Sequence, residues 1–226
     1  MSKIILKISG EALKDDNNLI SNKKLDIVLD TIELLKSHNH KVAIVVGGGN
    51  IFRGRENTEM DEVTRDTIGM MGTVINALYI KDYLVKHDLN VTISTPFDFP
   101  NLIENYTDEE LEEKYESGDV IIFGGGVGMS GYSTDSGVVL ASSKINANII
   151  IKMTNVDGVY DSDPKVNKKA KKYDKLTYEE VIEQNLGVMD KYAIKKCMEK
   201  GIVIVVMNFN NYKHILDRDN GTIIGG

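Results

Sequence analysis

Five short apolar runs constrain the fold of this 226-residue chain more than any other feature. None of them alternates apolar with polar residues, so each predicts a strand that is buried on both faces. Such strands are typical of mainly parallel sheets that helices cover on both sides. The runs are residues 4–6, 42–46, 120–123, 149–151 and 202–207.

The segments between these runs carry helix signals. Apolar residues recur at helical spacing within residues 25–35 and again within residues 70–78. Threonine precedes glutamate by three residues at positions 107 and 177, which is the spacing of a capping box at a helix start. Strands and helices therefore alternate. The sequence predicts an α/β fold, a three-layer αβα sandwich around a mainly parallel central sheet.

The composition excludes several classes of protein. With 42% hydrophobic and 27% charged residues it is typical of a globular protein, and no apolar stretch approaches the roughly 20 residues needed to cross a bilayer. We recognise no secretory signal at the N-terminus and expect a cytoplasmic protein with no membrane partner. The formal charge of −7 argues against a broad nucleic-acid surface, so we expect no nucleic-acid partner.

Cysteine and histidine point to no metal site or disulfide. The single cysteine, Cys197, has no partner within the chain, and its helical surroundings predict a small core residue. The four histidines lack the HExxH spacing and have no cysteine nearby in a metal-binding pattern. The sequence therefore assigns no metal ligands.

Three of the predicted strands run into conspicuous turns, at residues 7–10, 47–50 and 124–126. Because the carboxyl ends of parallel strands share one edge of a sheet, these turns should converge where ligands bind. Gly10 lets the backbone approach a ligand, and a helix starting near Glu11 would aim free N–H groups at an anion. Taken alone, the first turn is also typical of a solvated loop. Together the three turns predict a phosphate-binding edge.

A dinucleotide site is the first alternative, because residues 126–131 match the GxGxxG pattern after a strand. A Rossmann site also requires an acidic residue at the end of the next strand, whereas the run at 149–151 is followed by Lys152. The P-loop pattern is absent from the sequence. We therefore disfavour the dinucleotide hypothesis.

Charged residues beside the turns favour phosphoryl transfer: Lys7, Arg53, Asp135 and Lys152. This reaction requires mainly positioning and charge stabilisation. Each pair of like unit charges about 4 Å apart repels by roughly 4 kcal/mol at an effective dielectric near 20, so two phosphorylated substrates need fixed cations. A phosphate acceptor, with a second pKa near 6, needs no general base. The absence of a convincing catalytic histidine fits such an acceptor, and it equally fits a chain without catalysis.

The sequence resembles the bacterial uridylate (UMP) kinases of the amino-acid kinase superfamily. The resemblance covers almost the whole chain and is carried by residues 7–13, 47–54, 66–78, 133–136 and 152–164, with 189–190 and the strand ending at 208. It implies transfer of the γ-phosphoryl group of ATP to UMP with Mg²⁺, in pyrimidine nucleotide synthesis. It also implies a cytoplasmic homohexamer, UTP as a feedback inhibitor, and one amino-acid kinase-like domain over 1–226. The acceptor-binding half of that domain would span about 1–150 and the ATP-binding half about 151–226.

The resemblance also implies the site residues on the ATP side. The catalytic set would be Lys7, Arg53, Asp135 and Lys152, with Asp135 orienting both lysines. ATP phosphates would be held by Lys7, Ser9 and Gly10, with Gly49 and Arg53 at the ATP side of the reaction centre. The adenosine part would be bound by Thr154, Tyr160 and Asp163.

On the acceptor side, the resemblance implies that Gly48 and Asp66 bind UMP, Asp66 through the ribose hydroxyls. The uracil and phosphate would be wrapped by Val127, Gly128, Met129, Ser130, Gly131, Tyr132, Ser133 and Thr134. Relatives usually have Gly-Thr-Gly-Asn-Pro-Phe-Phe-Thr-Thr-Asp where residues 126–135 read Gly-Val-Gly-Met-Ser-Gly-Tyr-Ser-Thr-Asp. One threonine hydroxyl and one asparagine amide of the family pattern are therefore replaced.

Two further alternatives stay open at the level of sequence. The chain could be another kinase of the same superfamily, acting on a carboxylate, a carbamate or an isoprenoid phosphate. It could also be a non-catalytic nucleotide-binding relative, which the altered loop at residues 127–132 would favour. Residues 14–21 lack the glycine-rich form associated with GTP activation in some relatives, so we do not expect GTP control.

Overall fold

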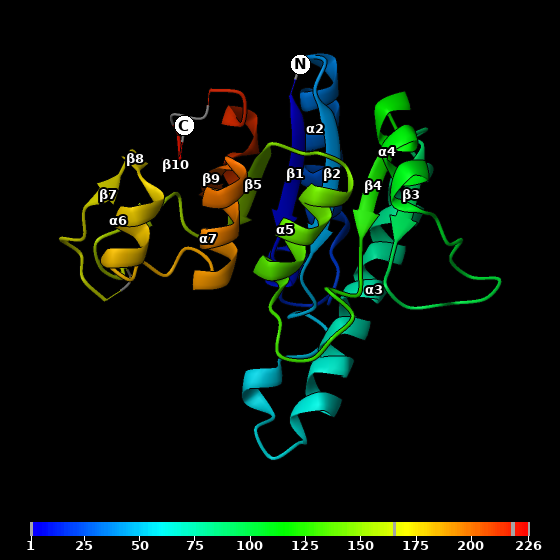
Figure 1. Cartoon of the computed structure of the whole chain (residues 1–226), viewed down its shortest axis with the longest axis horizontal. Helices are drawn as coiled ribbons and strands as arrows, with labels where there is room; N and C mark the ends of the chain where they lie inside the picture. The colour runs from blue at the N-terminus through cyan, green and yellow to red at the C-terminus, as the bar shows by residue number, and fades with distance from the viewer. Residues whose placement is uncertain (1, 165, 218–219, 226) are drawn as a thin grey trace.

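A central eight-stranded sheet organises the protein (Figure 1). The structure is a computed structural model that describes residues 2–164, 166–217 and 220–225. Neighbouring strands in this part of the chain pair in parallel, apart from the antiparallel pair formed by the sixth and seventh strands across the sheet. In order across the sheet, the strands are β3 (Val91–Ser94), β4 (Val120–Phe123), β2 (Lys41–Val46), β1 (Lys3–Ile8), β5 (Ile149–Thr154), β9 (Val203–Asn208), β10 (Thr222–Ile224) and β8 (Lys175–Leu176).

All five strands predicted from apolar runs are confirmed, and they form the interior of the sheet. The strands that the sequence did not reveal are β3, at one edge of the sheet, and β10 and β8, the last two strands at the other. β3 alternates Val and Ile with Thr and Ser, so it contains no apolar run, and β8 and β10 are only two and three residues long. A separate two-stranded ribbon pairs β6 (Val159–Tyr160) with β7 (Lys172–Tyr173).

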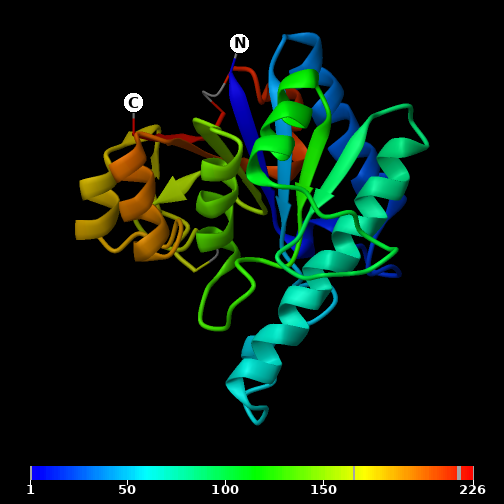
Figure 2. The same cartoon turned by 45° about the vertical axis from the view of Figure 1, so that its right-hand side comes forward.

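Helices cover both faces of the sheet, which confirms the three-layer αβα prediction (Figure 2). On one face, α2 (Asn22–Ser37) and α3 (Glu62–Val85) pack against Ile4, Leu6 and Ile8 of β1. On the other face, a second core that includes Ile5 receives residues from α4 (Asp108–Ser117), α5 (Thr134–Lys144), α6 (Tyr178–Glu183) and α7 (Lys191–Lys200). Adjacent residues of one strand therefore belong to two separate cores, as a sheet buried on both faces requires.

Local predictions about helix starts also hold. The helical spacing at residues 25–35 lies in α2 and that at 70–78 lies in α3. Thr107 and Thr177 each form a complete capping box with the glutamate three residues later, at the starts of α4 and α6.

Cys197 lies on the buried face of α7, as the prediction of a small core residue requires. None of the helices in the described part of the chain has the length and apolar character needed to span a membrane.

The carboxyl edge of the sheet positions the candidate site. Strands β1, β2, β4 and β5 run in parallel and deliver the chain to this edge together. The first short helix there is α1 (Gly10–Leu13), directly after β1. The start of α3 and the 3-10 turn η1 (Gly54–Glu56) project beyond the sheet (Figure 2). The 3-10 segment η2 (Phe209–His214) directly follows β9 and packs beside α2.

Candidate active site

A buried lysine–aspartate cluster, formed by Lys7, Asp135 and Lys152, lies at the carboxyl edge of the sheet. Lys7 on β1 and Lys152 on β5 are register partners on neighbouring strands, so their side chains leave the sheet on the same face. Both approach Oδ1 of Asp135: Nζ of Lys7 lies at 2.9 Å and Nζ of Lys152 at 3.3 Å. The three side chains are only 12%, 16% and 17% exposed for Lys7, Asp135 and Lys152.

The first turn of α5 presents Asp135 to the lysines. The N-cap of this helix is Ser133, whose Oγ accepts hydrogen bonds from the backbone N–H groups of Asp135 at 3.0 Å and Ser136 at 3.3 Å. Serine is favoured at this position because its oxygen satisfies free N–H groups of the first turn. The carboxylate is thus held by a capped helix, while the lysines are held by the sheet.

The electrostatics of the cluster favour bound anions. Burial alone would raise the pKa of Asp135, but Lys7 and Lys152 outweigh it and hold that pKa below its ordinary value. Burial and the nearby charge of Lys7 lower the pKa of Lys152 to about 8, although Asp135 opposes the shift. Lys152 also donates a hydrogen bond to the carbonyl of Val188. Two lysines share the one carboxylate of the cluster, so its basic side chains outnumber its acidic one, and Asp190 lies near Lys152 as a further acidic side chain.

The predicted convergence of the glycine turns is observed, and two of the glycines are required by space. A Cβ at Gly10 would lie 2.7 Å from both the carbonyl oxygen of Gly47 and the backbone nitrogen of Gly49. A Cβ at Gly48 would lie 2.6 Å from the carbonyl oxygen of Gly69 on α3. Backbone therefore packs on backbone at this edge, which a residue with a Cβ would prevent. Ser9 takes the N-cap position of α1 without a side-chain cap hydrogen bond.

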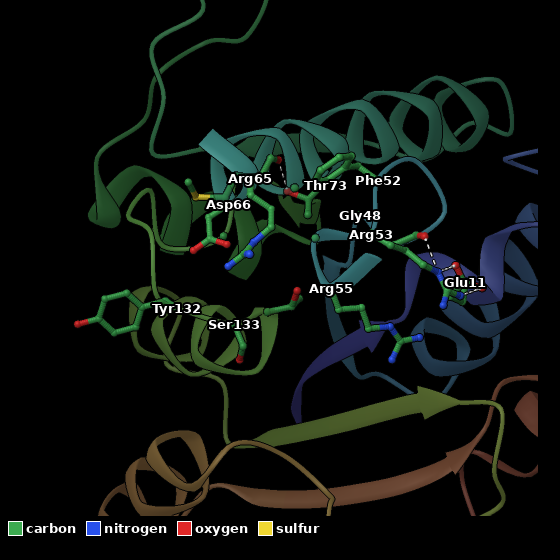
Figure 3. Close-up of a pocket in the computed structure, with 16 residues that line it drawn as sticks. Glu11, Gly48, Phe52, Arg53, Arg55, Arg65, Asp66, Thr73, Tyr132 and Ser133 are labelled. Atoms are coloured by element: carbon green, nitrogen blue, oxygen red, sulfur yellow. Dashed lines mark hydrogen bonds and ion pairs between the residues drawn. The ribbon is translucent and has the colours of Figure 1, made fainter. Parts of the chain in front are cut away.

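On one side of the cluster lies an open cavity of about 620 Å³, here called the arginine-lined cavity (Figure 3). Three arginines line it, together with Gly48, Gly49 and the α3 face that carries Asp66, Gly69, Met70 and Thr73. Ser133 and Thr134, which directly precede Asp135 in the sequence, also line it. In Figure 3, Arg65 and Asp66 lie on α3, across the view from Arg53 and Glu11. The arginines are Arg53, Arg55 and Arg65.

Arg53 lies in this cavity and is paired with Glu11. Its Nε donates to Oε1 of Glu11 at 2.9 Å, its Nη2 pairs with Oε2 of the same carboxylate, and its Nη1 lies 3.2 Å from Glu56. Among the interactions of the described residues, none joins Arg53 directly to the lysine–aspartate cluster. Burial would raise the pKa of Glu11, but Arg53 and Lys14 outweigh it and lower that pKa.

The glycine-rich loop after β4 folds back onto α3. The N–H of Gly125 donates to Oγ1 of Thr73 at 2.6 Å, and Oδ2 of Asp66 accepts from Oγ of Ser130 at 2.7 Å and from the N–H of Gly131 at 2.8 Å. The hydroxyl of Ser130 and the N–H of Gly131 lower the pKa of Asp66. Of the eight loop residues expected at the acceptor, three line the cavity: Tyr132, Ser133 and Thr134. The other five are absent from its lining: Val127, Gly128, Met129, Ser130 and Gly131.

On the other side of the cluster lies a second cavity of about 460 Å³, here called the β5 cavity. Lys152 lines it, with all three residues expected at adenosine: Thr154, Tyr160 and Asp163. The hydroxyl of Tyr160 donates to Oδ1 of Asp157 at 2.7 Å. The lysine–aspartate cluster therefore adjoins both cavities: Lys152 lines the β5 cavity, and Thr134, the residue before Asp135, lines the arginine-lined cavity.

Comparison with known proteins adds an independent line of evidence. The family model described as "Amino acid kinase family" matches residues 2–211, most of the chain. The chain belongs to the amino acid kinase family. The dinucleotide hypothesis, already disfavoured by Lys152, is therefore set aside.

Three solved structures of kinases are similar to this chain over nearly its whole length. The UMP kinase from Ureaplasma parvum is 33% identical, with a TM-score of 0.92, over 100% of this chain and 99% of that chain. The UMP kinase from Bacillus anthracis is 34% identical, with a TM-score of 0.93, over 99% and 96% of the two chains. The uridylate kinase from Archaeoglobus fulgidus is 28% identical, with a TM-score of 0.75, over 98% and 99%.

Several residues of this amino acid kinase family site were missed at the level of sequence. Glu11 lies within a motif already singled out, and its acidic character beside a basic turn was an available signal. Thr73 lies within the block at residues 66–78 that carries the resemblance, although no role was assigned to it. Arg65 gave no signal, because the cavity-facing side of a long helix is fixed only by packing. Asp190, the N-cap of α7, accepts from Oγ of Ser136 at 3.1 Å and from Ser133, and so ties α7 to the start of α5.

Proposed function

We propose that this chain is a uridylate kinase that transfers the γ-phosphoryl group of ATP to UMP, giving ADP and UDP. The observation that carries the proposal is the position of the lysine–aspartate cluster beside both the arginine-lined cavity and the β5 cavity. The named UMP kinases that match the chain over nearly its whole length support the choice of acceptor. The pathway that follows from this reaction is pyrimidine nucleotide synthesis.

UMP binds in the arginine-lined cavity under this proposal. Its 5′-phosphate lies among the arginines and the glycine turn at residues 48–49, because guanidinium groups and backbone N–H groups suit phosphate oxygens. Its ribose lies near Asp66, whose ionised carboxylate accepts hydrogen bonds from hydroxyls. The loop from Val127 to Thr134 covers the nucleoside, with Tyr132, Ser133 and Thr134 as the contacting residues.

ATP binds in the β5 cavity, with its adenosine part against Thr154, Tyr160 and Asp163. Its phosphates extend toward Lys7 and the turn at residues 9–10, with Gly49 and Arg53 on the far side of the transferring group. This division corresponds to an acceptor half at about 1–150 and an ATP half at about 151–226 of one domain. The two halves share the central sheet, so both substrates approach from its carboxyl edge.

The chemistry follows from charge. A phosphate oxygen of UMP attacks the γ-phosphorus of ATP, a new P–O bond forms, and the bond to the β–γ bridging oxygen breaks, which leaves ADP. At neutral pH the UMP phosphate is largely a dianion, so no side chain has to remove a proton. Lys7 and Lys152 stabilise the charge on the transferring group, and Asp135 holds both ammonium groups in place.

Magnesium is proposed as the metal that accompanies ATP. Within the described residues, no group of three or more His, Cys, Asp and Glu side chains forms a protein-only metal site. Mg²⁺ needs no such site, because in kinases it is bound chiefly by substrate phosphates and by one or two carboxylates. Under this proposal Asp135, which is paired with both lysines, would be the carboxylate near the phosphates. The ion would supply charge neutralisation, while the positioning is left to the lysines.

The assembly and regulation proposed here come from the resemblance to the bacterial enzymes. We propose a cytoplasmic homohexamer that is inhibited by UTP. A sedimentation or light-scattering measurement gives the mass of the assembly, and a mass of one or two chains would contradict the hexamer. Titration of the initial rate with UTP tests the regulation, and an unchanged rate at millimolar UTP would contradict it.

An acceptor screen tests the central proposal. ADP formation is coupled to an indicator reaction and is measured with ATP, Mg²⁺ and each of UMP, CMP, AMP and GMP, and then with a carboxylate and a carbamate as acceptors. We expect a rate with UMP that is far above the other three. Equal rates with all four would contradict the acceptor, and turnover only with carboxylates or carbamates would favour a different kinase of the family. Binding of UMP without turnover would favour a non-catalytic relative.

A further inference from the structure

The loop between β4 and α5, residues 124–133, is here called the acceptor loop, and it contains a serine that has no role in the reaction proposed above. Ser130 stands in a stretch where the family pattern has other residues, and it does not line the arginine-lined cavity. Its hydroxyl nevertheless reaches across 64 residues of sequence to the carboxylate of Asp66, at 2.7 Å. The contact joins a glycine-rich loop to a long helix, so it is a tertiary contact with a defined geometry.

Asp66 itself stands on a regular, capped helix. It lies near the start of α3, whose N-cap Asp61 accepts a hydrogen bond from the N–H of Thr64 at 3.0 Å. The side chains of Asp66 and Thr73 are two helical turns apart and lie on the same face of α3, and both line the cavity. The same loop donates to both of them, from Gly125 and from the segment at residues 130–131. The loop is therefore fastened to the cavity-facing side of α3 at two points.

The two donors to Asp66 use the same oxygen. Ser130 Oγ and the N–H of Gly131, at 2.7 and 2.8 Å, both donate to Oδ2. Within the part of the chain that the structure describes, neither contact involves Oδ1. A carboxylate oxygen has lone pairs for about two hydrogen bonds, so Oδ2 is filled while Oδ1 stays free to accept. These donors also fix the rotation of the carboxylate, which an isolated aspartate side chain leaves broad.

Glycine makes this arrangement accessible to the loop. Gly131 has a φ of +85°, in the region that L-residues with a side chain rarely adopt, and a Cβ there would meet nothing within 4 Å. Its role is therefore to set the direction of the backbone, which turns its N–H toward Asp66. Ser130 and Gly131 act as one pair of donors.

We propose that Ser130 is a positioning residue for acceptor recognition: with the N–H of Gly131 it holds Oδ2 of Asp66, so that Oδ1 faces the ribose hydroxyls of the acceptor nucleotide. The inference rests on the proposed UMP site and assigns a new role to a residue that does not itself touch the nucleotide. It gives the altered loop of this chain a function in selecting ribose.

The test compares two acceptors and three forms of the enzyme. The acceptors are UMP and 2′,3′-dideoxyuridine monophosphate, which lacks both hydroxyls that Asp66 would bind. The enzymes are wild type, Ser130→Ala and Ser130→Thr, and Ser117→Ala is the matched control. Ser117 also donates its hydroxyl to a nearby acceptor, but it lies on α4, away from the cavity. For each combination, kcat and KM are measured at saturating ATP and Mg²⁺.

We expect Ser130→Ala to raise KM for UMP about tenfold, since one of two hydrogen bonds to a charged carboxylate is lost. Its kcat should stay within about twofold, and its KM for the dideoxy acceptor should stay within about twofold of wild type, in keeping with the context dependence of such bonds. Ser130→Thr keeps the hydroxyl and should restore KM for UMP, and Ser117→Ala should match wild type throughout.

Other results overturn the positioning role. If Ser130→Ala leaves KM for UMP unchanged, the contact does not orient Asp66. If it raises KM equally for both acceptors, the effect is on the loop as a whole and not on ribose recognition. Turnover of UMP by the wild-type enzyme tests the proposed function separately, so the kinase assignment stands in either case. Only a wild-type enzyme that fails to use UMP would remove that assignment.

Discussion

The lysine–aspartate cluster and the acceptor loop are built in opposite ways. Lys7 and Lys152 stand on adjacent strands in fixed register, and Asp135 stands on a capped helix, so regular backbone sets the distances among the three. The loop after β4 has no regular structure from Gly124 to Ser133 and is tied to α3 by side-chain hydrogen bonds. The comparison teaches that the proposed charge-stabilising centre is held by regular backbone, whereas the loop proposed to recognise the acceptor is held by a few side-chain hydrogen bonds.

Among the changes predicted here, removal of the Lys7 side chain should reduce turnover the most. Lys7→Ala deletes a buried cation of the cluster, and we expect kcat to fall about 100- to 1000-fold, as for other preorganised electrostatic groups. The matched control is Lys3→Ala on the same strand, whose side chain pairs with Glu112 and Glu116 away from the cavities. Steady-state kinetics with a thermal melt of each variant makes the measurement. Near-normal turnover of the Lys7 variant would exclude this lysine from the centre.

The dependence of kcat/KM on pH tests the charge of Lys152 in the cluster. The pKa of Lys152 is lowered from 10.5 to about 8, so the side chain is charged below that pH and becomes neutral above it. We expect kcat/KM for ATP to fall about tenfold per pH unit above pH 8, as for loss of one essential proton. Lys152→Arg should lack this alkaline limb, because guanidinium stays protonated. A flat wild-type profile to pH 10 would contradict the role of Lys152.

The lowered pKa of Lys152 also predicts how folding stability changes with pH, and that change is opposite in sign to the change in activity. Since the folded chain holds the Lys152 proton less tightly than the unfolded chain, the unfolded state binds more protons between about pH 8 and 10.5. In that window the contribution of Lys152 to folding stability therefore rises with pH. Loss of activity above pH 8 without a lower melting temperature would attribute the loss to the charge of Lys152. A parallel loss of both would attribute it to unfolding.

Much of the rigid part could be predicted from sequence, because strands buried on both faces carry unbroken apolar runs, as in residues 42–46. Lys7 and Lys152 follow such runs directly, so their convergence at one edge was predictable. The edge strand β3 was not, since its alternating Thr92 and Ser94 interrupt the pattern. The pairing of Ser130 with Asp66 was also beyond sequence reasoning, because no periodicity relates a loop to a helix 64 residues away.

Removal of the Arg65 side chain on α3 should have a smaller effect, confined to KM for the acceptor UMP. Arg65 lines the arginine-lined cavity but contributes to none of the ion pairs of the cluster in the described chain. We expect Arg65→Ala to raise KM for UMP about tenfold, with kcat and KM for ATP within about twofold, because it removes one charged contact to a bound phosphate. Arg65→Lys should recover part of the loss. Equal increases in both KM values would contradict the division into two cavities.

The smallest effect is expected where the loop meets α3. Thr73→Val keeps the shape of the side chain but removes the hydroxyl that accepts from the buried N–H of Gly125. An unpaired buried N–H costs about 1–3 kcal/mol, so we expect the free energy of unfolding to decrease by about that amount. KM for UMP should rise a few-fold while KM for ATP stays constant. Thr67→Val is the control, because its hydroxyl binds only the carbonyl of Val63 on the exposed side of α3. Equal destabilisation by the two variants would contradict the fastening role of Thr73.

Inhibition by a bisubstrate analogue tests the central claim most directly. In P1-(5′-adenosyl)-P5-(5′-uridyl) pentaphosphate, an adenosine and a uridine are joined by one phosphate chain. If the two cavities meet at the lysine–aspartate cluster, this molecule should fill both at once, inhibit competitively against ATP and against UMP, and bind much more weakly to Lys7→Ala. Competition with ATP alone, or equal affinity for wild type and Lys7→Ala, would contradict a shared phosphoryl-transfer centre.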